Sequence, residues 1–94
     1  MLPQKRIPTH PGAILQEDFL EPMGLTQVPL ASQLNISVQR INELIVGKRG
    51  VRTQIAWLLS QAFETTPEFW LTLQIRYDLA IHKPTRKLRA IKAN

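Results

Sequence analysis

Residues 30–47 read LASQLNISVQRINELIVG. Apolar side chains recur in it at the spacing of two amphipathic helices: Leu30, Ala31 and Leu34, and then Val38, Ile41, Leu44 and Ile45. Only Asn35, Ile36 and Ser37 separate the two patterns. Asn tolerates the left-handed backbone of a sharp turn, and Ser favours the position that caps a helix N-terminus. The stretch therefore predicts two helices joined by a tight turn.

This arrangement is a helix-turn-helix, in which the first helix supports the second so that its polar face can enter the major groove of DNA. The predicted outer face of the second helix carries Gln39, Arg40, Asn42 and Glu43. Gln and Asn pair with adenine and Arg with guanine, so these four side chains are candidate base readers. Glu43 could accept a hydrogen bond from cytosine or balance Arg40. The alternative for the whole face is an ordinary solvated helix surface, but its position beside the turn and a basic loop favours DNA.

The segment that follows, GKRGVRT at residues 47–53, contains three bases and no acid. Its two glycines free the backbone for close approach, and its cations flank the N-terminus of the next predicted helix, which attracts anions. The segment therefore predicts an anchor for DNA phosphates, with a solvated basic loop as the alternative. The candidate phosphate-contacting residues are Ser37, Lys48, Arg49, Arg52 and Thr53.

The charge of the whole chain agrees with a polyanionic partner. Twelve Lys and Arg face seven Asp and Glu, which gives a net charge of +5. The bases are segregated, because five of them and no acid follow Asp78. The C-terminal bases could follow the DNA backbone or could form a disordered, solubilising end.

Helix start and stop signals divide the rest of the chain. Pro11 begins a first helix that closes at Pro22 and Gly24, and His10 is expected to assist its start. Thr26, Thr53 and Thr66 are the expected N-caps of the second, fourth and fifth helices, Gly47 is the expected end of the third, and the fifth extends to about His82. We expect an all-α domain of five helices over residues 11–82, an extended arm at residues 1–10 and a basic tail at residues 83–94.

The fifth predicted helix is apolar on two sides. Phe69, Trp70, Leu73, Tyr77 and Ala80 form one stripe, and Leu71, Ile75 and Leu79 form a second. A helix on the surface of a small domain needs only one apolar stripe, so the second predicts a contact with another copy of the chain. Burial of both stripes inside one monomer is the alternative. A two-fold dimer would place two recognition helices about 34 Å apart, which suits a palindromic operator.

Other classes of protein find little support in the residues. There is no cysteine, and His10 and His82 lie far apart in sequence without a companion ligand, so we expect neither a metal site nor a cofactor. No Ser or Thr has a plausible catalytic partner, so we do not expect an enzyme. No segment is apolar for long enough to span a bilayer, and no secretory signal opens the chain, so we expect a cytoplasmic protein.

Several linked motifs over residues 7–82 resemble the HigA-type antitoxin family. They include Thr9-His10-Pro11-Gly12, LEPMGL at 20–25, QRINELIVGKR at 39–49 and PEFWLTLQIRYDL at 67–79. This family, also labelled virulence-associated protein I, belongs to the phage-repressor-like helix-turn-helix group. The chain has Asn35 where the family often has Gly, and Pro29 where a helix former is more usual.

The resemblance implies a homodimeric antitoxin that binds an RNase toxin of the RelE-like fold and represses its own operon. Two alternatives stay open. One is a solitary helix-turn-helix regulator without a toxin, and the other is a protein-interaction adaptor that has lost DNA binding.

Overall fold

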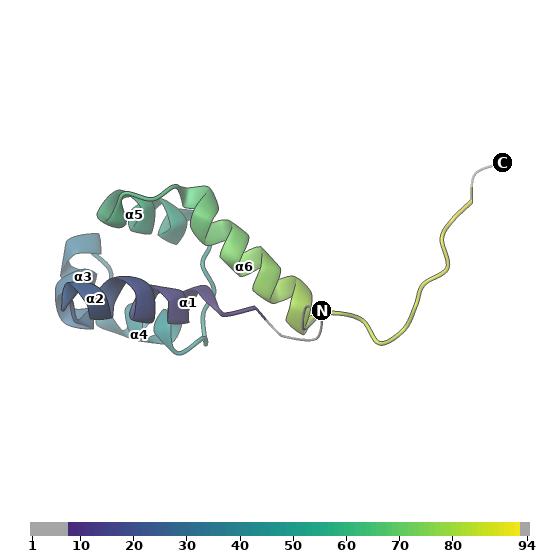
Figure 1. Ribbon diagram of the computed structural model, residues 1–94, viewed down its shortest axis with the longest axis horizontal. Coiled ribbons are helices and arrows are strands. Elements are labelled where there is room, and N and C mark those ends of the chain that lie inside the picture. Colours follow the sequence, from purple (N-terminus) through teal and green to yellow (C-terminus); the bar gives the residue numbers. More distant parts are fainter. Residues whose placement is uncertain (1–7, 93–94) are drawn as a thin grey trace.

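The computed structural model describes residues 8–92. Its helices are α1 (Pro11–Ile14), η1 (Leu15–Leu20), α2 (Glu21–Met23), α3 (Gln27–Leu34), α4 (Val38–Ile45), α5 (Thr53–Phe63) and α6 (Pro67–Ile81). The first three follow one another directly and form the first expected helix, so five helical units and no strand make up the described chain (Figure 1). Most of the expected N-terminal arm, residues 1–7, lies outside the described range. Within that range, no helix combines the length and the apolarity needed to cross a membrane.

The first helical unit contains a wide π-helical turn. In η1 the N–H of Glu21 donates to the carbonyl oxygen of Gln16, five residues earlier rather than four. Pro22 comes next, and it lacks the N–H of a regular helix position while its ring crowds the preceding turn. His10 begins the unit as expected, because its Nδ1 accepts the N–H of Gly12 at 2.9 Å.

The first helical unit lies directly on α4. Gly12 is buried, and a Cβ at this position would overlap the carbonyl oxygen of Leu44. This close approach buries Ile41 and Leu44 on the inner face of α4. The core continues through the expected face of α3 and the inner faces of α5 and α6: Leu15, Leu20, Leu30, Ala31, Leu34, Val51, Ile55, Ala56, Leu59 and Trp70. The apolar faces of α3 and α4 therefore pack against each other, as the helix-turn-helix pattern predicts.

Local backbone chemistry sets the turn and the helix ends. Asn35 adopts the left-handed conformation, with φ of 57°, as expected, and Gly47 does so after α4, with φ of 82°. Ser37 caps α4, and Thr66 caps α6. The expected cap of α5 is wrong by one residue, because Arg52 takes the extended cap conformation and Thr53 is already helical. Helix ends shift in this way because any residue can supply the cap backbone.

α6 closes the domain over α1 and α5 (Figure 1). Trp70 is fully buried, its ring lies 5.1 Å from that of Phe19, and its Nε1 donates to Thr65 Oγ1 at 2.8 Å. Tyr77, about two helical turns further on, meets His10 edge to face at 4.8 Å between ring centres. α6 is therefore fixed against the start of the first helix as well as against α5.

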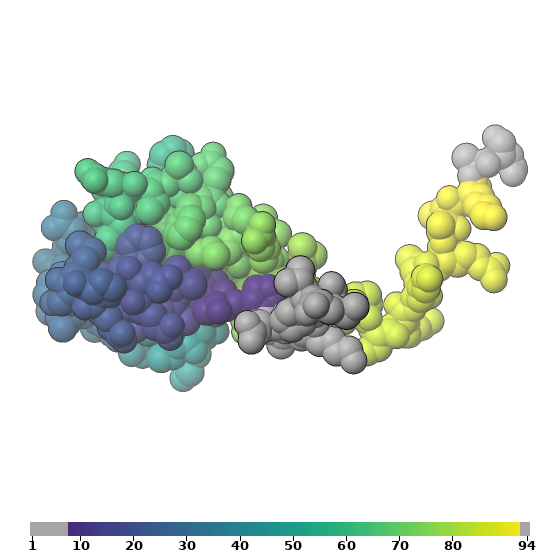
Figure 2. All heavy atoms as spheres, in the orientation of Figure 1, coloured from purple at the N-terminus to yellow at the C-terminus, as the bar shows by residue number. Residues whose placement is uncertain are grey.

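The chain beyond α6 leaves the helical body. Residues 83–92 have neither helix nor strand and are exposed throughout. Figure 2 shows this segment, in yellow, extending away from the packed helices. It contains all the bases that follow Asp78 in the sequence.

The burial of Leu44 predicts its contribution to stability. Replacement by Ala removes a side chain that is 2% exposed and leaves a cavity between α1, α3 and α4, at a cost of about 2–5 kcal/mol in the free energy of unfolding. Urea unfolding monitored by circular dichroism measures this cost. Val28→Ala is the control, because Val28 is 63% exposed on α3 and its loss should change stability by less than about 0.5 kcal/mol. Equal stabilities of the two variants would show that the helix register is wrong.

The cap formed by His10 predicts a dependence of stability on pH. Burial lowers the pKa of His10 below its ordinary 6.5, against a smaller opposing effect of Asp78. The neutral ring stabilises the fold above pH 6.5, because only the neutral ring offers Nδ1 to Gly12, and this contribution is lost as the pH falls through the lowered pKa.

His10→Asn keeps a side-chain acceptor at the cap but does not titrate in this range. Between about pH 7.5 and about pH 5.5, wild-type stability should therefore fall more than that of His10→Asn, as measured by urea unfolding. Parallel pH profiles of the two proteins would contradict the role given to His10.

Candidate nucleic-acid interface

α4 presents one polar face to solvent. Its N-terminus is fixed by Ser37, whose hydroxyl oxygen accepts the N–H of Arg40 at 3.1 Å. Opposite the buried Ile41 and Leu44, the side chains of Gln39 and Asn42 are exposed. Val38 was expected on the apolar stripe but is 40% exposed at the first position of the helix, where α3 and the core do not reach it. The outer face of α4 is therefore exposed at Val38, Gln39 and Asn42.

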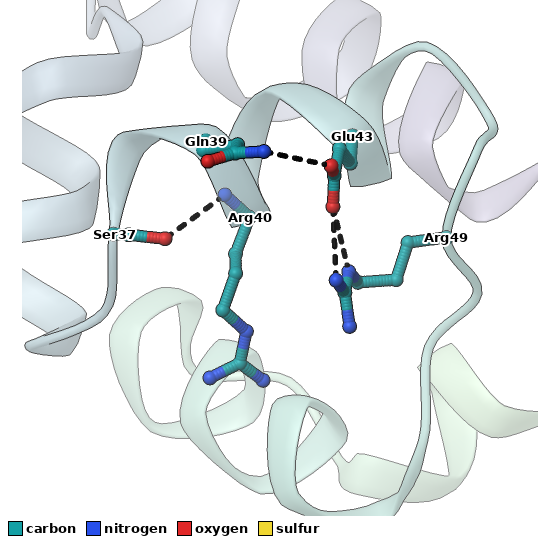
Figure 3. Close-up of polar contacts among 5 residues, drawn as sticks. All are labelled: Ser37, Gln39, Arg40, Glu43 and Arg49. Carbon is teal, nitrogen blue, oxygen red and sulfur yellow. Dashed lines mark hydrogen bonds and ion pairs between the residues drawn. The ribbon is translucent and has the colours of Figure 1, made fainter.

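Glu43 connects this face to the basic loop. Its Oε2 accepts a hydrogen bond from Gln39 Nε2 at 3.2 Å, and its Oε1 accepts from Arg49 Nε and Nη2 at 3.1 and 2.9 Å (Figure 3). The hydrogen bonds from Arg49 and then from Gln39 lower the pKa of Glu43, so its carboxylate is charged at neutral pH. Glu43 was expected either to accept from cytosine or to balance the charge of Arg40. In the folded chain it forms an ion pair with Arg49 and not with Arg40.

Arg40 departs from the other three candidate base readers. Its side chain extends away from Gln39 and Glu43 (Figure 3). It lines a hollow of about 90 Å³ together with Arg49, Arg52 and the first turn of α5. Within the described residues its Nε is buried and has no hydrogen-bond partner. Three arginines, one each from α4, the loop and the cap position of α5, thus line one small hollow.

The backbone of the basic loop is anchored on α4. The N–H groups of Lys48 and Arg49 donate to the carbonyl oxygen of Glu43 at 2.8 and 3.2 Å, while both side chains remain exposed. Arg52 and Thr53 are also exposed at the start of α5. Within residues 8–92 no side chain caps α5, so the N–H groups of its first turn have no intrahelical acceptor, and Gln54 and Ile55 of this turn line the hollow. The structure thus brings Arg49 and Arg52 to one hollow, with Lys48 and Thr53 exposed in the same segment, whereas Ser37 lies at the other end of α4, at its N-terminus.

The two apolar stripes of α6 have different surroundings. The stripe of Trp70 packs inward, with Leu73, Tyr77 and Ala80 half-buried and Phe69 39% exposed. The second stripe is exposed at Ile75 and Leu79, by 57% and 70%, whereas Leu71 is half-buried against the core. Burial of both stripes within one monomer, the alternative considered above, therefore does not occur.

The sequence patterns missed one polar residue near this surface. Gln74 lies on α6 and is 9% exposed, and its side chain contacts the backbone of the basic loop. It follows Trp70 by four residues and precedes Asp78 by four, a spacing that places all three on one side of a helix. The sequence signal that could have revealed this residue is a Gln within an otherwise apolar stripe.

Comparisons with known proteins agree with this geometry. A helix-turn-helix family model matches residues 17–70. Virulence-associated protein A' of Dichelobacter nodosus is 42% identical over 82 residues, which cover 85% of this chain and 70% of that protein. Antitoxin HigA-1 of Vibrio cholerae is 42% identical over 76 residues, which cover 80% of this chain and 70% of that protein.

Solved structures of similar proteins include several complexes with DNA. Pseudomonas aeruginosa antitoxin HigA with the higBA promoter superposes with a TM-score of 0.77 at 35% identity and covers 79% of this chain and 80% of that one. Antitoxin GraA in complex with its operator gives a TM-score of 0.76 at 33% identity and covers 95% of this chain and all of that one.

The fold and the exposed polar helix are those of a helix-turn-helix protein. The chain belongs to the helix-turn-helix family and, within it, to the group of HigA-type antitoxins and virulence-associated proteins. The relatives carry the names of antitoxins, virulence-associated proteins and helix-turn-helix transcriptional regulators, which agrees with the expectation that the chain is not an enzyme.

Proposed function

We propose that this protein is a sequence-specific transcriptional repressor that binds a palindromic operator as a homodimer. One observation carries the proposal: α4 is packed on its apolar face alone and leaves Gln39 and Asn42 exposed, with the basic loop directly beyond them. This is the arrangement in which a recognition helix enters the major groove while neighbouring cations hold the backbone. The operator and promoter complexes of the relatives support the same assignment.

The candidate residues divide into readers and anchors. Gln39 and Asn42 are the proposed base readers, because their amide groups are exposed on the outer face of α4. Glu43 bridges Gln39 and Arg49 through its two carboxylate oxygens, and the same carboxylate is the proposed acceptor for cytosine.

Arg40 was expected to read bases, but the direction of its side chain favours phosphate. It shares a hollow with Arg49, Arg52 and the uncapped N-terminus of α5, where backbone N–H groups and guanidinium groups together suit one DNA phosphate. We therefore group Arg40 with the anchors Ser37, Lys48, Arg49, Arg52 and Thr53.

Assembly is proposed through the outer stripe of α6. Ile75 and Leu79 lie one helical turn apart and expose apolar surface that a second copy of the chain would cover. Leu71 extends this stripe toward the core. A symmetric pair of α6 helices would present two copies of α4 to consecutive turns of the major groove.

The relatives named as antitoxins support a second role, the neutralisation of an RNase toxin of the RelE-like fold. This role rests on family membership. The test is coexpression of the protein with the product of the adjacent reading frame. A small basic product that arrests growth when expressed alone, and that copurifies with this protein, is the expected result. A neighbour without toxicity would leave the repressor as a solitary regulator.

The division into readers and anchors predicts two kinds of loss. Gln39→Ala should cost about 1–3 kcal/mol on the operator and little on random DNA, because a base-edge contact is removed. Arg49→Ala should weaken binding to both and should flatten the slope of log K against log salt by about one unit, because one phosphate contact is removed. Fluorescence anisotropy at several salt concentrations measures both quantities.

The matched control is Gln61→Ala on α5, which removes an exposed amide away from the proposed DNA interface. It should bind as the wild type does. Equal losses of Gln39→Ala on operator and random DNA would exclude α4 as the reader. If the wild type binds neither DNA at low salt, the repressor function is excluded, and the alternative function of a toxin-binding adaptor takes its place.

The proposed dimer predicts the mass of the protein in solution and the variants that reduce this mass to that of a monomer. Light scattering at micromolar concentration should give twice the chain mass of 10.8 kDa. Ile75→Asp with Leu79→Asp should give the monomer mass, because both side chains are exposed in one chain and would face each other as like charges across the interface. Met23→Asp with Val28→Asp, at similarly exposed apolar positions, should remain dimeric. A monomeric wild type would contradict the interface.

A further inference from the structure

The buried amide of Gln74 connects α6 to the basic loop. Its Oε1 accepts the N–H of Val51 at 2.7 Å, and its Nε2 donates to Asp78 Oδ1 at 2.8 Å. Val51 is buried and lies between Arg49 and Arg52, two of the proposed phosphate anchors. A single side chain of α6 thus holds the backbone at the middle of the anchor segment.

The packing around this contact leaves little freedom. A Cβ on Gly50 would lie 2.9 Å from Cδ and from Oε1 of Gln74, so the loop backbone rests directly on the amide. On its other side the same loop is fixed to α4 through the carbonyl oxygen of Glu43. The loop is therefore held between α4 and α6, and Gln74 is the residue of α6 that contacts it.

We propose that Gln74 is a positioning residue that sets the phosphate-anchoring loop and thereby couples α6 to DNA affinity. The proposal rests on the DNA-binding function proposed above. Phosphate contacts depend on where Arg49, Arg52 and the first N–H groups of α5 are held, and Val51 N–H is the point at which α6 fixes that segment. Because Ile75 follows Gln74 directly, a partner bound to the outer stripe of α6 would act on the helix that orients this amide.

Asp78 completes the arrangement, because it orients the amide so that Oε1 faces Val51. The donor and acceptor can be exchanged without changing the total charge. In Gln74→Glu with Asp78→Asn, one carboxylate oxygen at position 74 would still accept from Val51 N–H, and the new amide at position 78 would donate to the other oxygen. This double variant is a matched rescue for Gln74→Met, which keeps the length of the side chain and removes the acceptor.

The test compares the full-length wild type, Gln74→Met and the double variant. A hollow of about 310 Å³ is lined by Gly50, Val51, Arg52, Gln74 and Asp78, so a methionine side chain of similar length has room at position 74 and Gln74→Met is expected to fold. Circular dichroism checks the helix content, and amide hydrogen exchange reports directly on Val51. The DNA probes are upstream DNA from the protein's own operon and a random duplex of equal length, each at several salt concentrations.

Gln74→Met should bind both probes about tenfold more weakly and should flatten the salt slope by about one unit, because a phosphate anchor is no longer held in place. The ratio of operator to random affinity should stay within about twofold, because the readers on α4 are unchanged. The double variant should restore affinity and slope, and protection of the Val51 amide should be lost and regained in parallel.

Wild-type affinity and slope in a folded Gln74→Met variant would overturn the proposal and leave Gln74 a purely structural role. A selective loss on the operator alone would also overturn it, because the effect would then lie in base reading. If the wild type bound neither probe, the proposed function itself would fail, which is distinct from either result.

Discussion

The contact between Gly12 and the backbone of Leu44 is the constraint on which the rest of the structure depends. No side chain fits between the first helix and α4 at this point, so the two helices meet directly. Ile41 and Leu44 are buried as a result, and only the opposite face of α4 is left for a ligand. Polar side chains on that face are then held by a rigid helix, which base recognition requires because a displacement of about an ångström removes a bidentate hydrogen bond.

α6 performs three tasks with three sets of side chains. Trp70 fills the core, Gln74 holds the basic loop, and Ile75 and Leu79 remain exposed on the outer side. In the proposed function, assembly and DNA binding therefore share this helix. A partner that displaces α6 would then change the position of the proposed phosphate anchors without touching DNA, and the energetic coupling between the two surfaces would be reciprocal.

The sequence predicts features set by local backbone chemistry better than features set by packing. Asn35 adopts the expected left-handed turn because its short polar side chain tolerates that conformation in any surroundings. Periodicity alone places Val38 on the buried stripe, but burial depends on what lies opposite the first turn of α4. The ion pair of Glu43 with Arg49 and the contact of Gln74 with the loop join residues whose proximity depends on the folded loop and on tertiary packing, so spacing rules did not reveal them.

In the proposed complex, two copies of α4 read one operator while the basic loops hold its backbone. Hydroxyl-radical footprinting of the DNA upstream of the protein's own operon measures where the protein lies on that DNA. We expect two protected half-sites of inverted sequence whose centres lie about one helical turn, roughly 10 base pairs, apart. Uniform protection that follows protein concentration without regard to sequence would contradict this expectation, and so would a single protected half-site.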